Sequence, residues 1–337
     1  MHRDSKTLKS TLIVKSIGIP DVCSPNLAHL RIENVPSFLQ IAEKNKISLL
    51  FLRAIVSGVD GHPFMSALLQ YEQRYQRTLE LVKFVASILE KEKISYTLFK
   101  TLKPFPYVPS DVDILLWSNN DLKIFERRLN SENCVSLERD AYGVTMFSPT
   151  HKLNIDLTTQ IAVSGMVYLN KELIFDHISE IEFHGNTVRT LEPAAELLAV
   201  TAHSIFKEQM FTLSDYYTLV LLAQHWGEAS KLAEKLHLKH ALETVLRLTE
   251  TITLNAFGSL NPLSKKTIAL GITHESTSSD KDIELPKKYD VSTMIVELLK
   301  KLATDPIATS SLSNIARSFY DPAFYRKIVE HVTREKY

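Results

Sequence analysis

Glycine is scarce in this 337-residue chain, which contains only nine glycines. All-β proteins with many tight turns depend on glycine, so the composition argues against that class. The sequence also lacks Gly-x-Gly-x-x-Gly, Gly-Lys-Ser and Gly-Lys-Thr. Because these motifs bring the backbone close to phosphate groups in Rossmann and P-loop enzymes, their absence argues against both folds.

Cysteine, net charge and long apolar runs are equally limited. The two cysteines, Cys23 and Cys134, lie far apart and form no Cys-x-x-Cys, which argues against a disulfide framework and a zinc site. The formal net charge is zero, so the chain is not a uniformly basic nucleic-acid binder. No stretch approaches the roughly 18 apolar residues of a membrane span, and the first residues form no apolar signal core. We therefore expect a cytoplasmic protein with no membrane partner.

The most informative stretch is Asp111-Val-Asp-Ile-Leu-Leu116, in which acidic and apolar residues alternate. A period of two is typical of a β-strand, so Asp111 and Asp113 should lie on one face and Val112 and Ile114 on the other. For these two carboxylates alone, the alternative is a half-exposed strand with an acidic solvent face.

A second segment, Leu153-Asn-Ile-Asp-Leu157, repeats this pattern and places Asp156 opposite its apolar face. If the two strands are neighbours in a sheet, Asp156 can join Asp111 and Asp113 around one or two metal ions. Clustered carboxylates are the oxygen ligands that suit Mg²⁺ or Mn²⁺. Such a site would support in-line attack on a nucleoside triphosphate.

The order of Phe99-Lys100, a loop ending in Ser110, Asp111-Val112-Asp113 and a later Asp156 resembles the nucleotidyltransferase superfamily of the polymerase-beta type. More narrowly, it is similar to uncharacterised bacterial and archaeal members with a lysine before the loop and a helical tail. The resemblance covers roughly residues 79–222. It implies that Asp111 and Asp113 are metal ligands for the triphosphate and that Asp156 activates the incoming hydroxyl.

The loop before these aspartates departs from the family pattern. Where the family usually has Gly-Ser or Gly-Gly, this chain reads Lys100-Thr101-Leu102-Lys103. Small residues at that place let backbone N–H groups approach phosphates. Here Lys100 and Lys103 could supply positive charge instead, and Thr101 or Ser110 a hydroxyl group.

The helical tail supplies two further candidate residues. Lys207 follows His203 by four positions on a helix expected from Pro193, and Asp215 stands at the start of the next helix. The resemblance implies that Lys207 binds a triphosphate oxygen and that Asp215 holds Lys207 or His203 in place. The alternative is an interhelical ion pair that only fixes packing.

We expect an α+β fold with a small mixed nucleotidyltransferase sheet, flanking helices and a helical C-terminal region. The predicted domains are an N-terminal helical region (1–93), a catalytic core (94–192) and a helical C-terminal domain (193–337). The expected elements are a helix over 63–91, strands over 95–99, 112–117, 135–139, 143–147, 152–158, 182–183 and 188–190, and a helix over 122–129 capped by Asn119 or Asn120. A hairpin turn is expected at 184–186, helices from 193 and 214 to about 257, a polar linker over 263–290, and helices over 291–302 and 324–333.

The leading hypothesis is a metal-dependent transfer of a nucleoside monophosphate from an NTP to a hydroxyl of an unknown acceptor, with release of pyrophosphate. The acceptors that remain open are the 3′ end of a tRNA, a protein side chain and a small hydroxylated molecule. The alternative is a nucleotidyltransferase-like scaffold that has lost catalysis and binds a protein or RNA partner. The loop without glycine favours that alternative.

Overall fold

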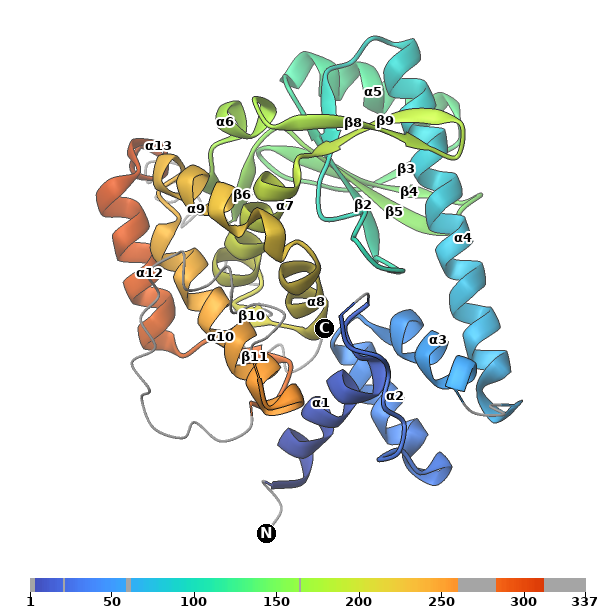
Figure 1. Cartoon of the computed structure of the whole chain (residues 1–337). Coiled ribbons are helices and arrows are strands. Elements are labelled where there is room, and N and C mark those ends of the chain that lie inside the picture. The colour runs from blue at the N-terminus through green and yellow to red at the C-terminus, as the bar shows by residue number, and fades with distance from the viewer. Residues whose placement is uncertain (1–3, 21, 59–61, 164, 260–282, 312–337) are drawn as a thin grey trace.

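The computed structural model describes residues 4–20, 22–58, 62–163, 165–259 and 283–311, and these form an α+β fold (Figure 1). The α+β class expected from the sequence is thereby confirmed. The α-helices are α1 (Asp4–Ile17), α2 (Val35–Lys44), α3 (Ser48–Gly58), α4 (His62–Lys91), α5 (Asn119–Ser131), α6 (Lys171–Phe175), α7 (Pro193–Ala202), α8 (Leu213–Leu221), α9 (Trp226–Lys235), α10 (Lys239–Phe257), α12 (Val291–Thr304) and α13 (Pro306–Ser310). The strands are β1 (Tyr96–Leu98), β2 (Asp111–Leu116), β3 (Val135–Arg139), β4 (Gly143–Ser148), β5 (Leu153–Thr158), β6 (Ile161–Val163), β7 (Met166–Leu169), β8 (Ile178–Phe183), β9 (Asn186–Leu191), β10 (Met210–Phe211) and β11 (Lys287–Lys288).

The main sheet is mixed and has seven strands in the order β3-β4-β5-β2-β1-β9-β8. Strand β2 pairs with β5 in parallel and with β1 in antiparallel orientation. It therefore lies in the interior of the sheet, where both of its edges are hydrogen-bonded. The strands predicted to carry the three aspartates are thus direct neighbours.

One face of this sheet packs against α4 and α5. Val112, Ile114 and Leu116 of β2 are buried there together with Ile155 and Leu157 of β5. The alternating pattern predicted such an apolar face for each strand, because successive side chains point to opposite sides. Asp111, Asp113 and Asp156 are consequently on the other face, toward the tail helices.

The N-terminal and C-terminal helices share a larger hydrophobic core. Helices α1 to α3 and α7 to α10 all contribute buried side chains to it. Tyr217 of α8 is fully buried and donates a hydrogen bond of 3.1 Å to the Gly18 carbonyl, just after α1. Figure 1 shows these two groups of helices side by side below the sheet. The predicted domain boundaries at 93 and 192 remain predictions.

Several local predictions are confirmed, and the predicted cap of α5 is wrong. The long helix runs over His62–Lys91, and the turn at 184–186 joins β8 to β9, with His184 and Gly185 at φ 49° and 79° as a tight hairpin requires. Helix α5 is capped by Ser118 and not by Asn119 or Asn120. The Ser118 hydroxyl accepts the Asp121 N–H at 3.1 Å, and the Asp121 carboxylate accepts the Ser118 N–H in return.

Short elements between the predicted strands were not expected from the sequence. These are β6, β7 and α6, which are too short to show a clear period. The helix predicted over 291–302 is α12. Most of the predicted linker (263–282) and the predicted helix over 324–333 lie outside the described residues. Within the described ranges, none of the helices combines the length and apolar character that a membrane crossing requires.

Candidate functional site

The three predicted aspartates come from two adjacent parallel strands. In the register of β2 and β5, Asp113 is opposite Asp156 and Asp111 is opposite Asn154. Side chains that stand opposite one another on neighbouring strands are close enough to interact with each other. The structure thus brings Asp111, Asp113 and Asp156 to one sheet face, as the sequence predicted.

Burial makes this acidic cluster unfavourable without positive charge. Burial raises the pKa of Asp111, and the negative charge of Asp156 raises it further. Burial also raises the pKa of Asp113, although the Lys100 ammonium group partly offsets it. Asp156 Oδ1 is buried and has no hydrogen-bond partner among the described residues. The cluster therefore has an unsatisfied acceptor that a proton or a cation could fill.

Lys100 stands beside these carboxylates in an unusual backbone conformation. Its φ of 59° is left-handed, a conformation that glycine adopts most readily. The stretch Lys100-Thr101-Leu102-Lys103 contains no glycine, so a lysine takes this conformation. The Lys100 N–H donates to the Glu196 carboxylate at 3.0 Å, and Nζ lies 3.4 Å from Asp113 Oδ2. The backbone donor at this place is therefore already paired with a carboxylate.

His203 connects Lys100 to the tail helices. It begins a π-helical turn, His203–Lys207, that follows α7. Its Nδ1 lies 3.1 Å from Lys100 Nζ and 3.3 Å from the Tyr168 hydroxyl, while Nε2 lies 3.0 Å from Glu208 Oε1. Because an ammonium group can only donate, Nδ1 accepts and Nε2 carries the proton. Burial and the nearby Lys100 charge hold the His203 pKa well below its usual range, so the ring is neutral.

Lys207 and Asp215 have different surroundings. Burial would lower the pKa of Lys207, but its interactions with the Tyr168 phenol and with the carboxylates of Asp113, Glu208 and Asp156 together outweigh burial and raise it. Asp215 instead accepts from the Thr212 N–H and hydroxyl at 2.9 and 2.7 Å and so caps α8. The acid that pairs with His203 is Glu208, and the hydrogen bonds of Asp215 go to Thr212, so the prediction that Asp215 holds Lys207 or His203 in place has no direct contact behind it among the described residues.

Thr101 and Ser110 occupy different surroundings in the loop. The Thr101 hydroxyl is buried, accepts the Asp113 N–H at 3.0 Å and donates to the Phe99 carbonyl. It therefore fixes the backbone of β2. Ser110 is exposed and donates to Asp111 Oδ1 at 3.1 Å. Of the two hydroxyls, Ser110 is the one that lies at the cavity.

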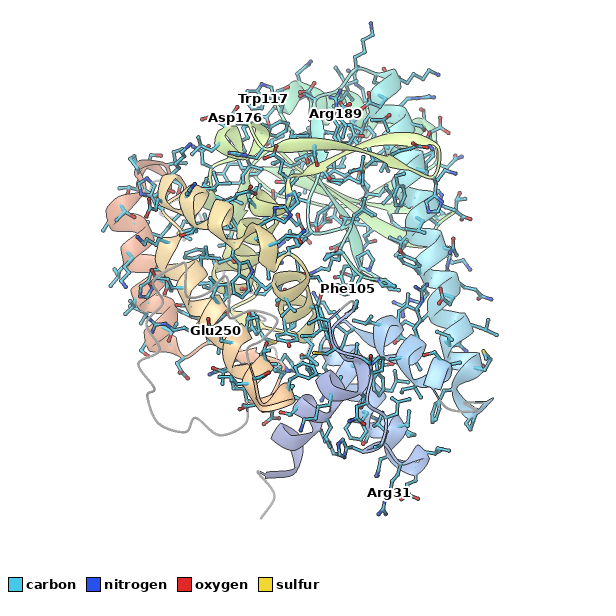
Figure 2. All side chains as sticks on the ribbon, in the orientation of Figure 1. Arg31, Phe105, Trp117, Asp176, Arg189 and Glu250 are labelled. Atoms are coloured by element: carbon cyan, nitrogen blue, oxygen red, sulfur yellow. The ribbon has the colours of Figure 1, made fainter. Side chains whose placement is uncertain are left out.

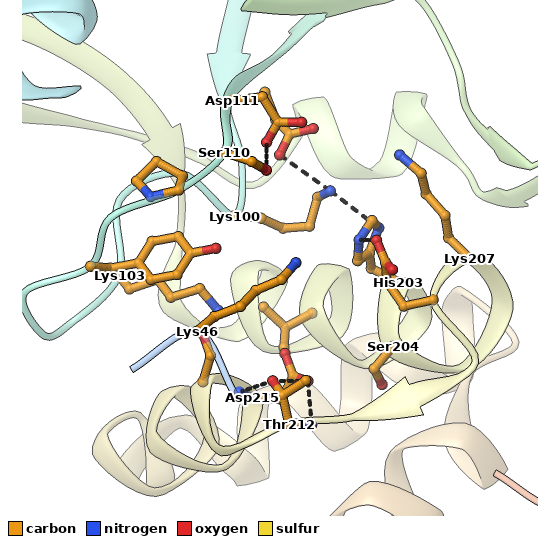
Figure 3. A pocket seen from close by; sticks show the side chains of 16 residues that line it. Lys46, Lys100, Lys103, Ser110, Asp111, His203, Ser204, Lys207, Thr212 and Asp215 are labelled. Atoms are coloured by element: carbon orange, nitrogen blue, oxygen red, sulfur yellow. Dashed lines mark hydrogen bonds and ion pairs between the residues drawn. The ribbon is translucent and has the colours of Figure 1, made fainter. Parts of the chain in front are cut away.

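Two adjoining cavities meet at this face of the sheet. The first lies between the loop and α8 and is drawn in Figure 3, and the second lies over β4, β5 and β6. Both are lined by Lys100, Asp113 and Lys207. Phe105 lies at the centre of the molecule, where the loop meets the helices, and packs edge-on against Tyr217 at 6.0 Å (Figure 2). The loop is thereby anchored above the first cavity.

Several lining residues of the first cavity had no assigned role in the sequence. Among them are Lys46, Ser204, Glu208 and Ser214. Lys46 belongs to the N-terminal helices, and no motif or spacing links it to the aspartates. Only the packing of distant segments brings it to this cavity.

The donor set at the aspartates fits a hard divalent cation in chemical type, since all three side chains offer carboxylate oxygens and one of these is unsatisfied. In the arrangement described, Lys100 supplies the positive charge beside Asp113. Within the described ranges, no three histidine, cysteine, aspartate or glutamate side chains form a group that could hold a metal ion. Metal binding would therefore require Lys100 and the carboxylates to rearrange.

Comparison with known proteins adds little to this site. No family model matches the chain, and no curated protein matches its sequence. A solved structure, that of an antigenic nucleotidyltransferase-like protein from Paracoccidioides brasiliensis, matches 50% of this chain and 93% of its own chain, with 11% identity and a TM-score of 0.32. A likeness this distant establishes neither a shared fold nor a shared function.

Proposed function

We propose that this protein is a metal-dependent nucleotidyltransferase. It would transfer a nucleoside monophosphate from an NTP to a hydroxyl group of an acceptor and release pyrophosphate. The main support is the pairing of Asp113 with Asp156 on adjacent parallel strands, with Asp111 on the same strand face. The buried, unpartnered Oδ1 of Asp156 adds to it, because such an oxygen is available to a proton or a cation.

The proposed reaction is an in-line displacement. The acceptor oxygen attacks the α-phosphorus, the bond from that phosphorus to the oxygen bridging the β-phosphate breaks, and the hydroxyl proton passes to Asp156. Mg²⁺ or Mn²⁺, when bound, supplies positive charge that neutralises the phosphate oxygens. Asp111, Asp113 and Asp156 would hold it.

The remaining predicted residues would bind or position the nucleotide. Lys100, Ser110 and Lys207 line the first cavity and would contact phosphate oxygens. Thr101 would position the nucleotide indirectly, because its hydroxyl fixes the backbone of Asp113. Asp215 would also act indirectly, because it caps the start of α8.

The test uses each α-labelled NTP with Mg²⁺ and three acceptor pools: RNA, protein and small molecules. The native protein should label one pool, and Asp113→Asn should reduce the labelling roughly 10²-fold or more because it removes charge that offsets the cation. Asp176→Asn is the control, since Asp176 is exposed at the end of α6, away from the cavities. Equal labelling by the native protein and Asp113→Asn would overturn the proposal.

The second candidate is a binding scaffold without catalysis. The ion pair of Lys100 with Asp113 and the engagement of the Lys100 N–H by Glu196 favour it, since both occupy groups that a nucleotide or cation would need. Calorimetry with millimolar NTP and Mg²⁺ separates the two. Absence of binding would favour the scaffold, whereas binding that requires Asp111 and Asp113 would favour the enzyme.

A further inference from the structure

Lys46 is the contribution of the N-terminal helices to the first cavity. It lies in the short connection between α2 and α3, and its side chain extends toward Lys100 and His203 (Figure 3). Lys46 and Asp111 also line a neighbouring groove between α4 and the loop. A residue about fifty positions before the predicted loop thus reaches the same space as the aspartates.

The neighbouring residue Asn45 fixes Lys46 in this place. Asn45 is fully buried, and its side-chain oxygen accepts the Leu213 N–H at 3.0 Å while its carbonyl accepts the Ser214 N–H at 3.1 Å. Its side-chain amide donates to the Leu285 carbonyl at 3.1 Å. These bonds attach the α2–α3 connection to the first turn of α8. They also satisfy backbone N–H groups of that turn, which are therefore not available to an anion. The positive charge in this part of the cavity comes from the lysine side chains.

Lys103 reaches the same cavity from the loop. Its Nζ donates to the Thr218 hydroxyl at 3.2 Å and lies 5.0 Å from the centre of the Tyr107 ring. Burial lowers the pKa of Lys46 and of Lys103. Nearby acids partly offset this effect, chiefly Glu208 and Asp215 for Lys46 and Asp215 and Glu196 for Lys103, and the Lys100 charge makes a smaller contribution that lowers both. Both ammonium groups therefore lie in a partly desolvated space with acids nearby, and a phosphate oxygen there could accept charge-assisted hydrogen bonds from them.

Ser214 adds an unsatisfied hydroxyl group to this part of the cavity. Its side chain is 1% exposed, and Oγ has no hydrogen-bond partner among the described residues. A buried hydroxyl without a partner is unfavourable, whereas a phosphate oxygen can accept from it. The cavity thus offers two ammonium groups and one hydroxyl donor at the side away from Asp156.

We propose that Lys46, Lys103 and Ser214 form a subsite for the terminal phosphates of an oligophosphate. Through Lys46, the N-terminal helices would select nucleoside triphosphates over monophosphates. The orientation of the nucleotide, with its α-phosphate at the aspartates, rests on the proposed function. Binding of an oligophosphate to the lysines does not depend on catalysis.

The test measures the affinity of the full chain for inorganic tripolyphosphate, ATP and AMP by calorimetry in the presence of EDTA. Lys46→Met keeps the length of the side chain but removes its charge, and it should weaken tripolyphosphate and ATP roughly 10- to 100-fold. Affinity for AMP should change less than about threefold, because AMP has no terminal phosphates. Lys46→Arg should retain most of the tripolyphosphate affinity.

Lys44→Met is the matched control, because Lys44 is exposed at the end of α2, two positions before Lys46. It should bind all three probes as the native protein does. Unchanged tripolyphosphate affinity in Lys46→Met, an equal loss for AMP, or no tripolyphosphate binding by the native protein would each overturn the subsite. None of these results bears on whether Asp113→Asn abolishes transfer, so the two proposals fail separately.

Discussion

Asp113 on β2 and Asp156 on β5 are opposite one another in adjacent parallel strands, and Asp156 Oδ1 is buried without a hydrogen-bond partner among the described residues. Asp156→Asn should reduce nucleotidyl transfer about 10²- to 10⁴-fold, because the amide cannot accept the hydroxyl proton. Its thermal stability should stay close to that of the native protein, since the change keeps the size of the side chain and Oδ1 makes no hydrogen bond that would be lost among the described residues. Transfer at the native rate would exclude Asp156 as the base, and Asp176→Asn serves again as the control.

Lys100 and a divalent cation should compete for Asp113, because Lys100 Nζ lies 3.4 Å from Asp113 Oδ2. Lys100→Met should therefore bind Mn²⁺ more tightly, by roughly two- to tenfold, and bind ATP more weakly. Mn²⁺ titration followed by electron paramagnetic resonance measures the first effect, and calorimetry the second. Weaker Mn²⁺ binding in this variant would contradict the competition. Lys123→Met, on the exposed side of α5, provides the control.

Thr101 should contribute to stability through its hydroxyl group. Thr101→Val keeps the shape but leaves the Asp113 N–H without its acceptor at 3.0 Å, so it should reduce the free energy of unfolding by about 1–3 kcal/mol. Thr101→Ser retains the hydroxyl and should lose less. Urea denaturation measures both variants. If Thr101→Val and Thr101→Ser reduce the free energy of unfolding equally, the hydroxyl is not the stabilising group.

His203 should make stability depend on pH. Its folded-state pKa lies well below the ordinary value of 6.5, chiefly because of burial and then the Lys100 charge. Well above pH 6.5 the ring is neutral in both the folded and the unfolded state, so it does not make the free energy of unfolding depend on pH. As the pH falls below that value, the unfolded state takes up a proton that the folded state does not, and stability falls by up to about 1.4 kcal/mol per pH unit.

His203→Asn should remove this contribution, because an amide oxygen can accept from Lys100 without titrating. The free energy of unfolding, measured between pH 7 and pH 5, should therefore fall less steeply in the variant than in the native protein. His29→Asn, at an exposed position, should keep the native slope. Identical slopes for the native protein and His203→Asn would show that His203 takes up its proton equally in both states.

The sequence by itself determined the faces of the strands and the long helix. In β2 and β5, alternation of apolar and acidic residues predicted which side chains would be buried against α4 and α5. The same alternation predicted the common face of Asp111, Asp113 and Asp156, and their adjacency needed only that the two strands pair. Such features could be predicted because side-chain direction in a strand depends on residues next to each other in the chain.

The tertiary structure alone decided what surrounds those aspartates. The contact of Lys100 Nζ with His203, the bond of the Lys100 N–H to Glu196, and the arrival of Lys46 in the cavity all join segments distant in sequence. Asn45 illustrates the reason, since one buried side chain fixes the N-terminal helices to α8 through bonds across 168 positions. Contacts of this kind arise from how whole elements pack, and no local period or motif in the sequence records them.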